Sequence, residues 1–160
     1  MKKVQYILMV AAMLFLSTIT MHCQLKSNQA HFTALSVGDK IPNLDLSGFT
    51  GANRQPASLY NFKTKLFVID FWATWCGSCI SSFPKLEKIK HQFDKDFNVL
   101  LVTNETENTV RQFNERRKKM GFDRLPFRTI YSDSLLAKLF PHESIPHYVW
   151  IDENLSLIHI

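Results

Sequence analysis

The sequence predicts an α/β fold, because short apolar runs alternate with amphipathic stretches along the chain. Residues 65–73 (KLFVIDFWA) are a continuous run of mostly β-branched and aromatic residues, which is typical of a fully buried strand. From Cys76 onwards, apolar side chains recur every three or four positions, as they do on one face of a helix. The chain has 160 residues and is 46% apolar, enough for one domain with a real core.

The segments before this buried strand predict only short elements. Residues 36–50 contain Pro42, alternating leucines and a glycine turn, a pattern typical of a short edge strand. Residues 51–64 are expected to be a loop with one helical turn around 58–62. The strand at 65–73 is therefore the first long element that we expect.

The longest predicted helix begins at Cys76. Its apolar face is formed by Ile80, Phe83, Leu86, Ile89, Phe93 and Phe97. Pro84 lies inside this stretch and removes one backbone hydrogen bond, so we expect either a kinked helix or two helices.

The second half of the chain predicts two further helices and three further strands. The expected elements are a buried strand at 98–103, a charged helix at 106–120, a short helix at 133–140, a strand at 146–152 and a paired strand at 155–160. Val110 and Phe113 are expected to face inward, and Gly121 to end the charged helix. Because the chain stops inside an apolar strand, we expect it to be a fragment.

Residues 1–23 have the features of an export signal. Lys2 and Lys3 precede an uncharged, mostly apolar run over 4–21. A cleaved secretory signal is the favoured interpretation, ahead of a lipid anchor on Cys23. An uncleaved membrane anchor ranks third, since the run is near the lower limit of about 17–25 residues for a membrane span.

All three alternatives place the domain outside the cytosol, in the periplasm or cell envelope. Residues 24–35 are predicted to be a polar tether and residues 36–160 a single domain. The formal charge is +5, of which Lys2 and Lys3 supply two. The remainder is too small to indicate a nucleic-acid partner.

The motif WCGSC allows three interpretations of Cys76 and Cys79. A zinc site needs about four ligands. The histidines show no paired ligand spacing at positions 31, 91, 142, 147 and 159, so we expect no metal. A structural disulfide across so short a loop stabilises little, because loop entropy is smallest for short loops.

A redox-active disulfide is the favoured interpretation. Cys76 opens a helix, where the unpaired N–H groups and the helix dipole lower the pKa of a thiol. Cys76 is therefore the expected nucleophile, and Cys79, one turn later, the resolving thiol. Gly77 lets a partner chain approach closely. Trp75 supplies apolar surface beside the thiols, and the alternative for it is an ordinary core aromatic.

Asp70 is the candidate proton acceptor. It lies in an otherwise apolar strand, where burial is expected to raise the pKa of a carboxyl. We expect it to take the proton of Cys79, through a water, during resolution. The alternative is a buried aspartate that only holds a structural hydrogen bond.

Asp70, residues 71–79 (FWATWCGSC) and Pro84 together resemble the thioredoxin superfamily, and specifically the exported TlpA/ResA-type thiol-disulfide oxidoreductases. Residues 37–42 (VGDKIP) match the segment that precedes the first strand in that family. The resemblance extends to about residue 155. It implies a thioredoxin-like three-layer sandwich, a central mixed β-sheet flanked by helices, with the C-terminal helix missing here.

The resemblance also implies a substrate platform at Ile145 and Pro146. A cis Pro146 would face the thiols and expose the backbone of Ile145 to a bound peptide. From the residues alone, a trans proline that opens a strand is an equal alternative. Together with Trp75, Gly77 and Ser78, these two residues form the predicted substrate-binding set.

Several positions depart from the family pattern. The cysteines enclose Gly-Ser rather than Gly-Pro, which is expected to alter the redox poise. Ser82 stands where many relatives have a glutamate, and Asp70 where many exported ones have an asparagine. His147 replaces a small hydroxyl residue and either tunes the thiolate or is a solvated loop residue.

We therefore expect an exported thiol-disulfide oxidoreductase that exchanges its Cys76–Cys79 pair with protein substrates, acting as a reductase. Its expected partners are protein disulfides and a redox partner protein, and it needs no cofactor beyond its own thiols. One alternative is a peroxiredoxin-like peroxidase, which requires a threonine where Ala73 stands. The other is a non-catalytic envelope interaction module with a fixed disulfide.

Overall fold

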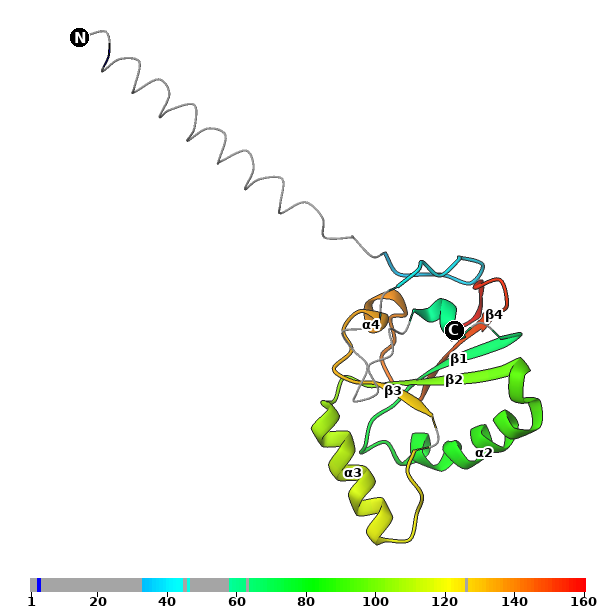
Figure 1. The fold of residues 1–160 in the computed structure, drawn as a ribbon. Coiled ribbons are helices and arrows are strands. Elements are labelled where there is room, and N and C mark those ends of the chain that lie inside the picture. The colour runs from blue at the N-terminus through cyan, green and yellow to red at the C-terminus, as the bar shows by residue number, and fades with distance from the viewer. Residues whose placement is uncertain (1–2, 4–32, 45, 47–57, 63, 126) are drawn as a thin grey trace. The chain divides into compact units, whose positions relative to one another are not determined.

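A mixed sheet forms the centre of the described part of the chain in the computed structural model (Figure 1). Its five strands lie in the order β3-β2-β1-β4-β5, with β1, β2 and β3 parallel and β4 and β5 antiparallel to their neighbours. The strands are β1 (Leu66–Phe71), β2 (Phe97–Val102), β3 (Arg128–Ile130), β4 (His147–Asp152) and β5 (Leu157–His159).

The structure describes residues 3, 33–44, 46, 58–62, 64–125 and 127–160. Residues 33–160 form one unit and residues 1–32 another. Apart from residue 3, the predicted export signal lies outside the described residues, so the domain boundaries stay predictions. Most of the predicted tether and residues 51–57 of the predicted loop also lie outside them. Within the described ranges, no helix has the length and apolar character needed to cross a membrane.

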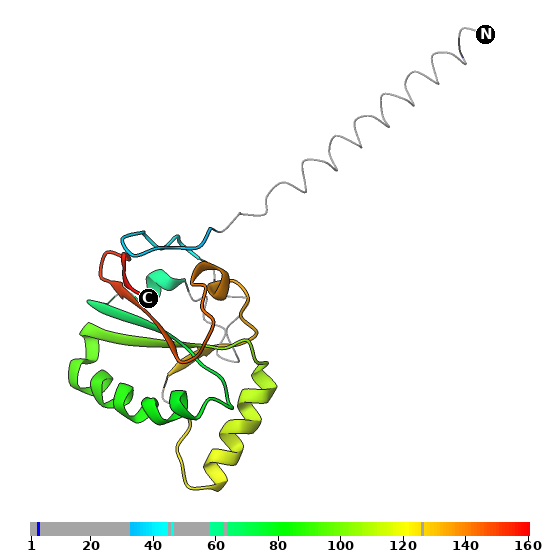
Figure 2. The same ribbon diagram turned by 180° about the vertical axis from the view of Figure 1, so that it is seen from behind.

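Helices lie on both faces of the sheet, as Figures 1 and 2 show from opposite sides. The helical elements are η1 (Leu59–Phe62), α2 (Gly77–Phe93), η2 (Asp94–Asp96), α3 (Glu107–Lys119) and α4 (Leu136–Leu139). The long helices α2 and α3 cover one face, and η1 and α4 cover the other. The three-layer sandwich predicted from the sequence is confirmed.

The two faces of β1 belong to two different apolar clusters. Alternation along the strand sends Phe67, Ile69 and Phe71 toward the η1 and α4 side. Val68 and, just past the strand end, Trp72 lie on the α2 and α3 side, with Asp70 between them on the same face. The apolar run at 65–73 is thus buried on both sides, which explains why it has no polar alternation except at Asp70.

The observed helix α2 differs from the predicted helix in its end and in part of its apolar face. It is a single helix with Pro84 inside it, so the alternative of two helices is wrong. It ends at Phe93, which is 52% exposed, and Phe97 is the first residue of β2 instead of a helical residue. Asp94, with φ 33°, and the short η2 turn the chain between them, so the helical spacing does not continue to Phe97.

Two strand predictions are also corrected. Residues 38–41 pair with 155–157 through an isolated bridge between Lys40 and Ser156 and three flanking backbone hydrogen bonds, so the expected edge strand is reduced to this short pairing within 36–44. Residues 45 and 47–50 of the predicted strand lie outside the described residues. Pro42 offers no N–H for a longer ladder. Conversely, β3 was not predicted, because its three residues, beginning with the exposed Arg128, are too short to show an alternation.

The remaining predicted elements are confirmed within a few residues. Helix α3 begins after Thr106, whose side chain accepts a hydrogen bond from the N–H of Thr109, and it buries Val110 and Phe113. Gly121 follows it with φ 82°, in the left-handed region that favours glycine. The predicted pairing of the last strand with 146–152 appears as the antiparallel pair β4 and β5.

Candidate active site

The two cysteines lie where β1 passes into α2. Cys76 is the N-cap residue of α2, and its Sγ accepts a hydrogen bond from the N–H of Cys79 at 3.2 Å. A sulfur in this position faces the unpaired N–H groups and the positive end of the helix dipole, which favour a thiolate. The sequence prediction that Cys76 opens the helix is confirmed.

Cys76 and Cys79 form a disulfide, with their Cα atoms 5.3 Å apart. Cys76 is 5% exposed and Cys79 is fully buried within the apolar cluster under α2. The Oγ of Ser78 lies 3.5 Å from the Sγ of Cys76. An incoming group therefore meets Cys76 first, and Cys79 can be reached only from within the protein.

Asp70 is fully buried on the face of β1 that α2 covers. Burial raises the pKa of its carboxyl to about 7 from an ordinary value of 3.8. Among the described residues, neither carboxylate oxygen has a hydrogen-bond partner. A carboxyl in this state exchanges its proton near neutral pH, as a general acid or base requires. The sequence-based alternative, an aspartate held by a structural hydrogen bond, has no support in the described residues.

The loop before β4 brings the predicted substrate platform to the same end of the sheet. The Ile145–Pro146 peptide bond is cis, which confirms the prediction from the family resemblance. Ile145 packs against both apolar clusters, including the one that contains the two cysteines. Gly77 and Ser78 are exposed, and the space around a Cβ at Gly77 is open.

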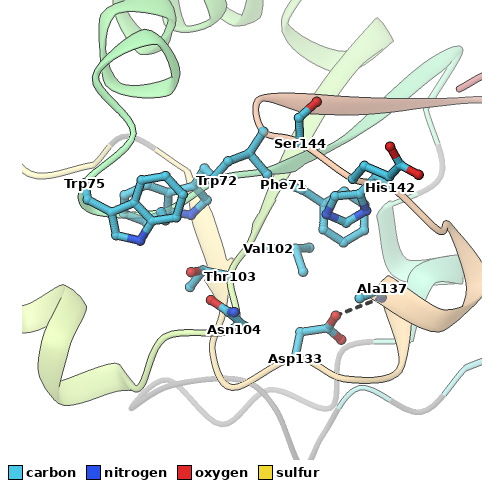
Figure 3. A pocket seen from close by; sticks show the side chains of 13 residues that line it. Phe71, Trp72, Trp75, Val102, Thr103, Asn104, Asp133, Ala137, His142 and Ser144 are labelled. Atoms are coloured by element: carbon cyan, nitrogen blue, oxygen red, sulfur yellow. Dashed lines mark hydrogen bonds between the residues drawn. The ribbon is translucent and has the colours of Figure 1, made fainter.

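A cavity of about 270 Å³ lies beside the cysteine loop (Figure 3). Trp72 and Trp75 lie at one end and His142 at the other, with Thr103 and Asn104 between them on the side opposite Ser144. Trp75 is 74% exposed, so it is a surface residue, and the alternative of a core aromatic is wrong. The cavity thus joins the residue before Cys76 to the residues before Pro146.

Glu105 is a site residue that the sequence did not reveal. Its carboxylate accepts hydrogen bonds from the backbone N–H of Thr74 at 2.7 Å and from the Thr74 hydroxyl at 2.8 Å. Its backbone also accepts from the N–H of Ser132, so it ties together three loops at this end of the sheet. No local pattern marks Glu105, because Thr74 lies 31 positions away.

His147 has a different environment from the one expected. It is the first residue of β4 and is half-buried, with its ring 4.6 Å from that of His142 in a stacked arrangement, so it is not a solvated loop residue. Burial lowers its pKa, and the neighbouring His142 and His159 lower it further. Both effects favour the uncharged form of the His147 imidazole.

No group of three or more histidine, cysteine or acidic side chains suited to a metal ion occurs among the residues that the structure describes. The structure does bring together Cys76, Cys79, Asp70 and Ile145 around one apolar cluster. Their chemical roles, and those of the exposed residues at the cysteine loop, stay predictions.

Comparison with known families and proteins gives a consistent result. The family model described as Redoxin matches residues 36–160. Tryparedoxin from Trypanosoma brucei brucei is 33% identical over 104 residues, which are 63% of this chain and 70% of that protein. Thiol-disulfide oxidoreductase ResA from Geobacillus thermodenitrificans is 28% identical over 72% of this chain and 67% of its own length.

Other curated matches are shorter. Thioredoxin-like protein YneN from Bacillus subtilis is 30% identical over 80 residues, 48% of this chain and 45% of that protein. The chain spans about half or less of the length of the first curated relatives it matches.

Solved structures agree with the fold. A putative thiol:disulfide interchange protein DsbE from Chlorobium tepidum superposes with a TM-score of 0.65 at 22% identity, covering 79% of this chain and 84% of the other. The thioredoxin domain of an oxidoreductase from Bacteroides vulgatus reaches 0.60 at 22% identity, covering 78% and 87%. At this identity the likeness shows a thioredoxin-like fold.

Proposed function

The chain belongs to the Redoxin family, within the thioredoxin superfamily, and we propose that it is a thiol-disulfide oxidoreductase that exchanges its Cys76–Cys79 pair with protein disulfides. The observation that carries the proposal is the disulfide at the start of α2, on the same face of the sheet as the buried Asp70, whose carboxylate has no hydrogen-bond partner in the part of the chain that the structure describes. The names of its relatives, among them a thiol-disulfide oxidoreductase, support it.

In the first step, the Cys76 thiolate attacks one sulfur of a substrate disulfide. The substrate S–S bond breaks, a mixed disulfide forms on Cys76, and one substrate thiolate leaves and takes a proton. Cys76 is suited to this step because the N–H of Cys79 and the helix dipole stabilise its negative charge.

In the second step, Cys79 attacks the Sγ of Cys76. The Cys79 thiol first gives its proton, through a water, to the Asp70 carboxylate, and the second substrate thiolate then leaves as the Cys76–Cys79 bond forms. Two electrons pass to the substrate. A redox partner protein that supplies two electrons regenerates the dithiol.

The substrate chain is proposed to lie along the backbone of Ile145, beside Pro146, in an extended conformation. Gly77 and Ser78 border this path, and Trp75 offers its exposed ring to an apolar side chain. The adjacent cavity has room for a side chain near the substrate cysteine. These contacts recognise backbone and apolar surface, which suits protein substrates.

We further propose that the protein is exported, acts in the cell envelope and works as a reductase. The charged start and apolar run at 1–23 support export. One structural neighbour is an exposed lipoprotein thioredoxin from Streptococcus pneumoniae, which is a property of that protein. Cell fractionation of the full chain tests the location.

The test of the activity is insulin reduction by the purified protein with dithiothreitol as electron source. We expect catalysis that Cys76→Ser abolishes, and a Cys79→Ser variant that accumulates a mixed disulfide on a non-reducing gel. Activity that survives Cys76→Ser would refute the exchange mechanism. Peroxide consumption without insulin reduction would instead support the peroxidase alternative.

The direction of electron flow is tested by equilibrating the pair against thiol buffers. A reductase requires a reduction potential near that of thioredoxin, about −270 mV. A potential near about −120 mV, typical of a strong oxidant, would overturn the reductase assignment while leaving the exchange activity intact.

A further inference from the structure

Two hydroxyl groups connect the resolving cysteine to β4. Ser82 lies one turn after Cys79 in α2, and its Oγ donates a hydrogen bond to the carbonyl oxygen of Cys79 at 2.7 Å. Tyr148, the second residue of β4, donates its phenol hydrogen to the Oγ of Ser82 at 3.3 Å. The pair joins residues 66 positions apart, so no local sequence pattern indicates it.

The direction of these two hydrogen bonds is fixed by the carbonyl group at their end. A carbonyl oxygen only accepts, so the single hydrogen of the Ser82 hydroxyl is committed to Cys79. Ser82 must then accept from Tyr148, whose own single hydrogen is committed to Ser82. The phenol oxygen of Tyr148 therefore presents only lone pairs to its other neighbours.

Asp70 is such a neighbour. It pairs with Tyr148 across β1 and β4, and directly opposed residues place their side chains on the same face, with Cβ atoms about 4.5–5.5 Å apart. Burial raises the pKa of Tyr148, its bond to Ser82 lowers it, and the charge of Asp70 raises it further. The two groups thus interact within the layer under α2.

We propose that Ser82 and Tyr148 are positioning residues for Asp70: their fixed hydrogen bonds point the phenol hydrogen at Ser82 and leave only oxygen lone pairs to face the carboxyl, which disfavours the ionised carboxylate and keeps Asp70 a strong proton acceptor at neutral pH. The side chains of Asp70 and Tyr148 share no hydrogen bond in the structure. The role in resolution rests on the proposed function. The effect on the titration of Asp70 does not.

The other groups around Asp70 do not account for its proton affinity through charge. At the start of α2, the titratable groups in the apolar cluster on the Asp70 face are Cys76 and Cys79, here joined as a disulfide. On β2, the residue opposite Asp70 is the apolar Leu101. Tyr131, after β3, packs against the same cluster, and α3 contributes Val110 and Phe113 to it. Burial raises the pKa of Asp70, and the fixed hydrogen bonds of Ser82 and Tyr148 withhold the hydroxyl donor that would lower it again.

The test is a double-mutant cycle read by ¹³C NMR titration of the Asp70 carboxyl carbon in the oxidised protein, with Asp70→Asn assigning the signal. Ser82→Ala frees the phenol hydrogen to donate to the ionised carboxylate. We expect the titration midpoint to fall by roughly one pH unit, because a hydrogen bond to the charged form favours that form. In a Tyr148→Phe background, Ser82→Ala should leave the midpoint unchanged.

Ser81→Ala is the matched control. Ser81 precedes Ser82 in the same helix and makes the same type of bond, from its Oγ to the carbonyl of Ser78 at 2.9 Å, but it is exposed. Its removal should leave the Asp70 midpoint in place. No shift with Ser82→Ala, or an equal shift with and without the Tyr148 hydroxyl, would overturn the proposal.

A second measurement separates this inference from the proposed function. The acid limb of the pH profile of kcat/KM for disulfide reduction should move with the Asp70 midpoint, to lower pH by the same amount in Ser82→Ala. If the protein reduces no disulfide, the proposed function fails, and the NMR cycle still decides whether Ser82 and Tyr148 control Asp70.

Discussion

Two buried aspartates lie on opposite faces of the sheet and differ in their partners. Asp133, 8% exposed, accepts hydrogen bonds from the N–H groups of Leu135, Leu136 and Ala137 on the α4 side, at 3.2, 2.9 and 2.9 Å. Asp70, on the α2 side, has no such donor among the described residues. A buried carboxylate that accepts hydrogen bonds from several backbone N–H groups thus has a structural role. A buried carboxylate without such donors is suited to proton transfer.

The largest effect that this comparison predicts is on the free energy of unfolding, through the pH-dependent ionisation of Asp70. Its folded pKa of about 7 lies above the ordinary value of 3.8, so the folded protein holds the proton more tightly than the unfolded chain. Stability that is present at low pH is therefore lost as pH rises from about 4 to about 7, by up to about 4 kcal/mol.

Asp70→Asn removes this loss. In urea unfolding of the oxidised protein, the variant should be more stable than wild type at pH 8 and equal to it near pH 4. A difference in the free energy of unfolding that is the same at both pH values would contradict the assignment of an ionisable, unpaired carboxyl.

Asp133→Ala should have the opposite sign and lower the stability of the protein. It leaves three buried or half-buried N–H groups without their acceptor, which is expected to lower the free energy of unfolding by about 2–4 kcal/mol. Asp123→Ala, at an exposed position, is the control and should have little effect. If Asp133→Ala stabilised the protein, the structural role assigned to Asp133 would be wrong.

Glu105 extends the comparison to the cysteine loop, because its carboxylate accepts hydrogen bonds from Thr74, two residues before Cys76. Glu105→Ala removes both hydrogen bonds to Thr74 and should lower the free energy of unfolding by about 1–2 kcal/mol. It should also slow insulin reduction, since the loop that carries Cys76 loses its support. Glu115→Ala, exposed on α3, is the control; slower reduction by both variants would exclude a specific role for Glu105.

The smallest effect on stability is expected at Trp75. Its ring is 74% exposed, so Trp75→Ala should change the free energy of unfolding by less than about 0.5 kcal/mol. The KM for a protein substrate should nevertheless rise by about tenfold, because aromatic contacts are often the strongest ones in an interface. Trp150→Ala, on β4, is the control; an unchanged KM for Trp75→Ala would remove it from the substrate surface.

Local patterns predicted much of the fold. The buried strand β1, the helix that begins after Cys76 and the capped helix α3 each have a signal within one window of the sequence. The same patterns were wrong at Phe97, where an apolar residue at helical spacing belongs to β2, and at β3, whose three residues carry no periodicity. A short strand such as β3 depends on pairing with a strand that is distant in the sequence, and local residue spacing does not reveal that pairing.

The sequence by itself determined the cysteine pair at the start of a helix and a carboxyl buried in β1. Both follow from residue type and local order: CxxC places two thiols one helical turn apart, and an aspartate inside an apolar strand must be buried. Only the tertiary structure decided which groups surround them. Glu105 reaches Thr74 across 31 positions, and Tyr148 reaches Ser82 across 66. Such contacts depend on how β1, β2, β4 and α2 pack, and hydrogen bonds are satisfied between whichever groups that packing brings within reach.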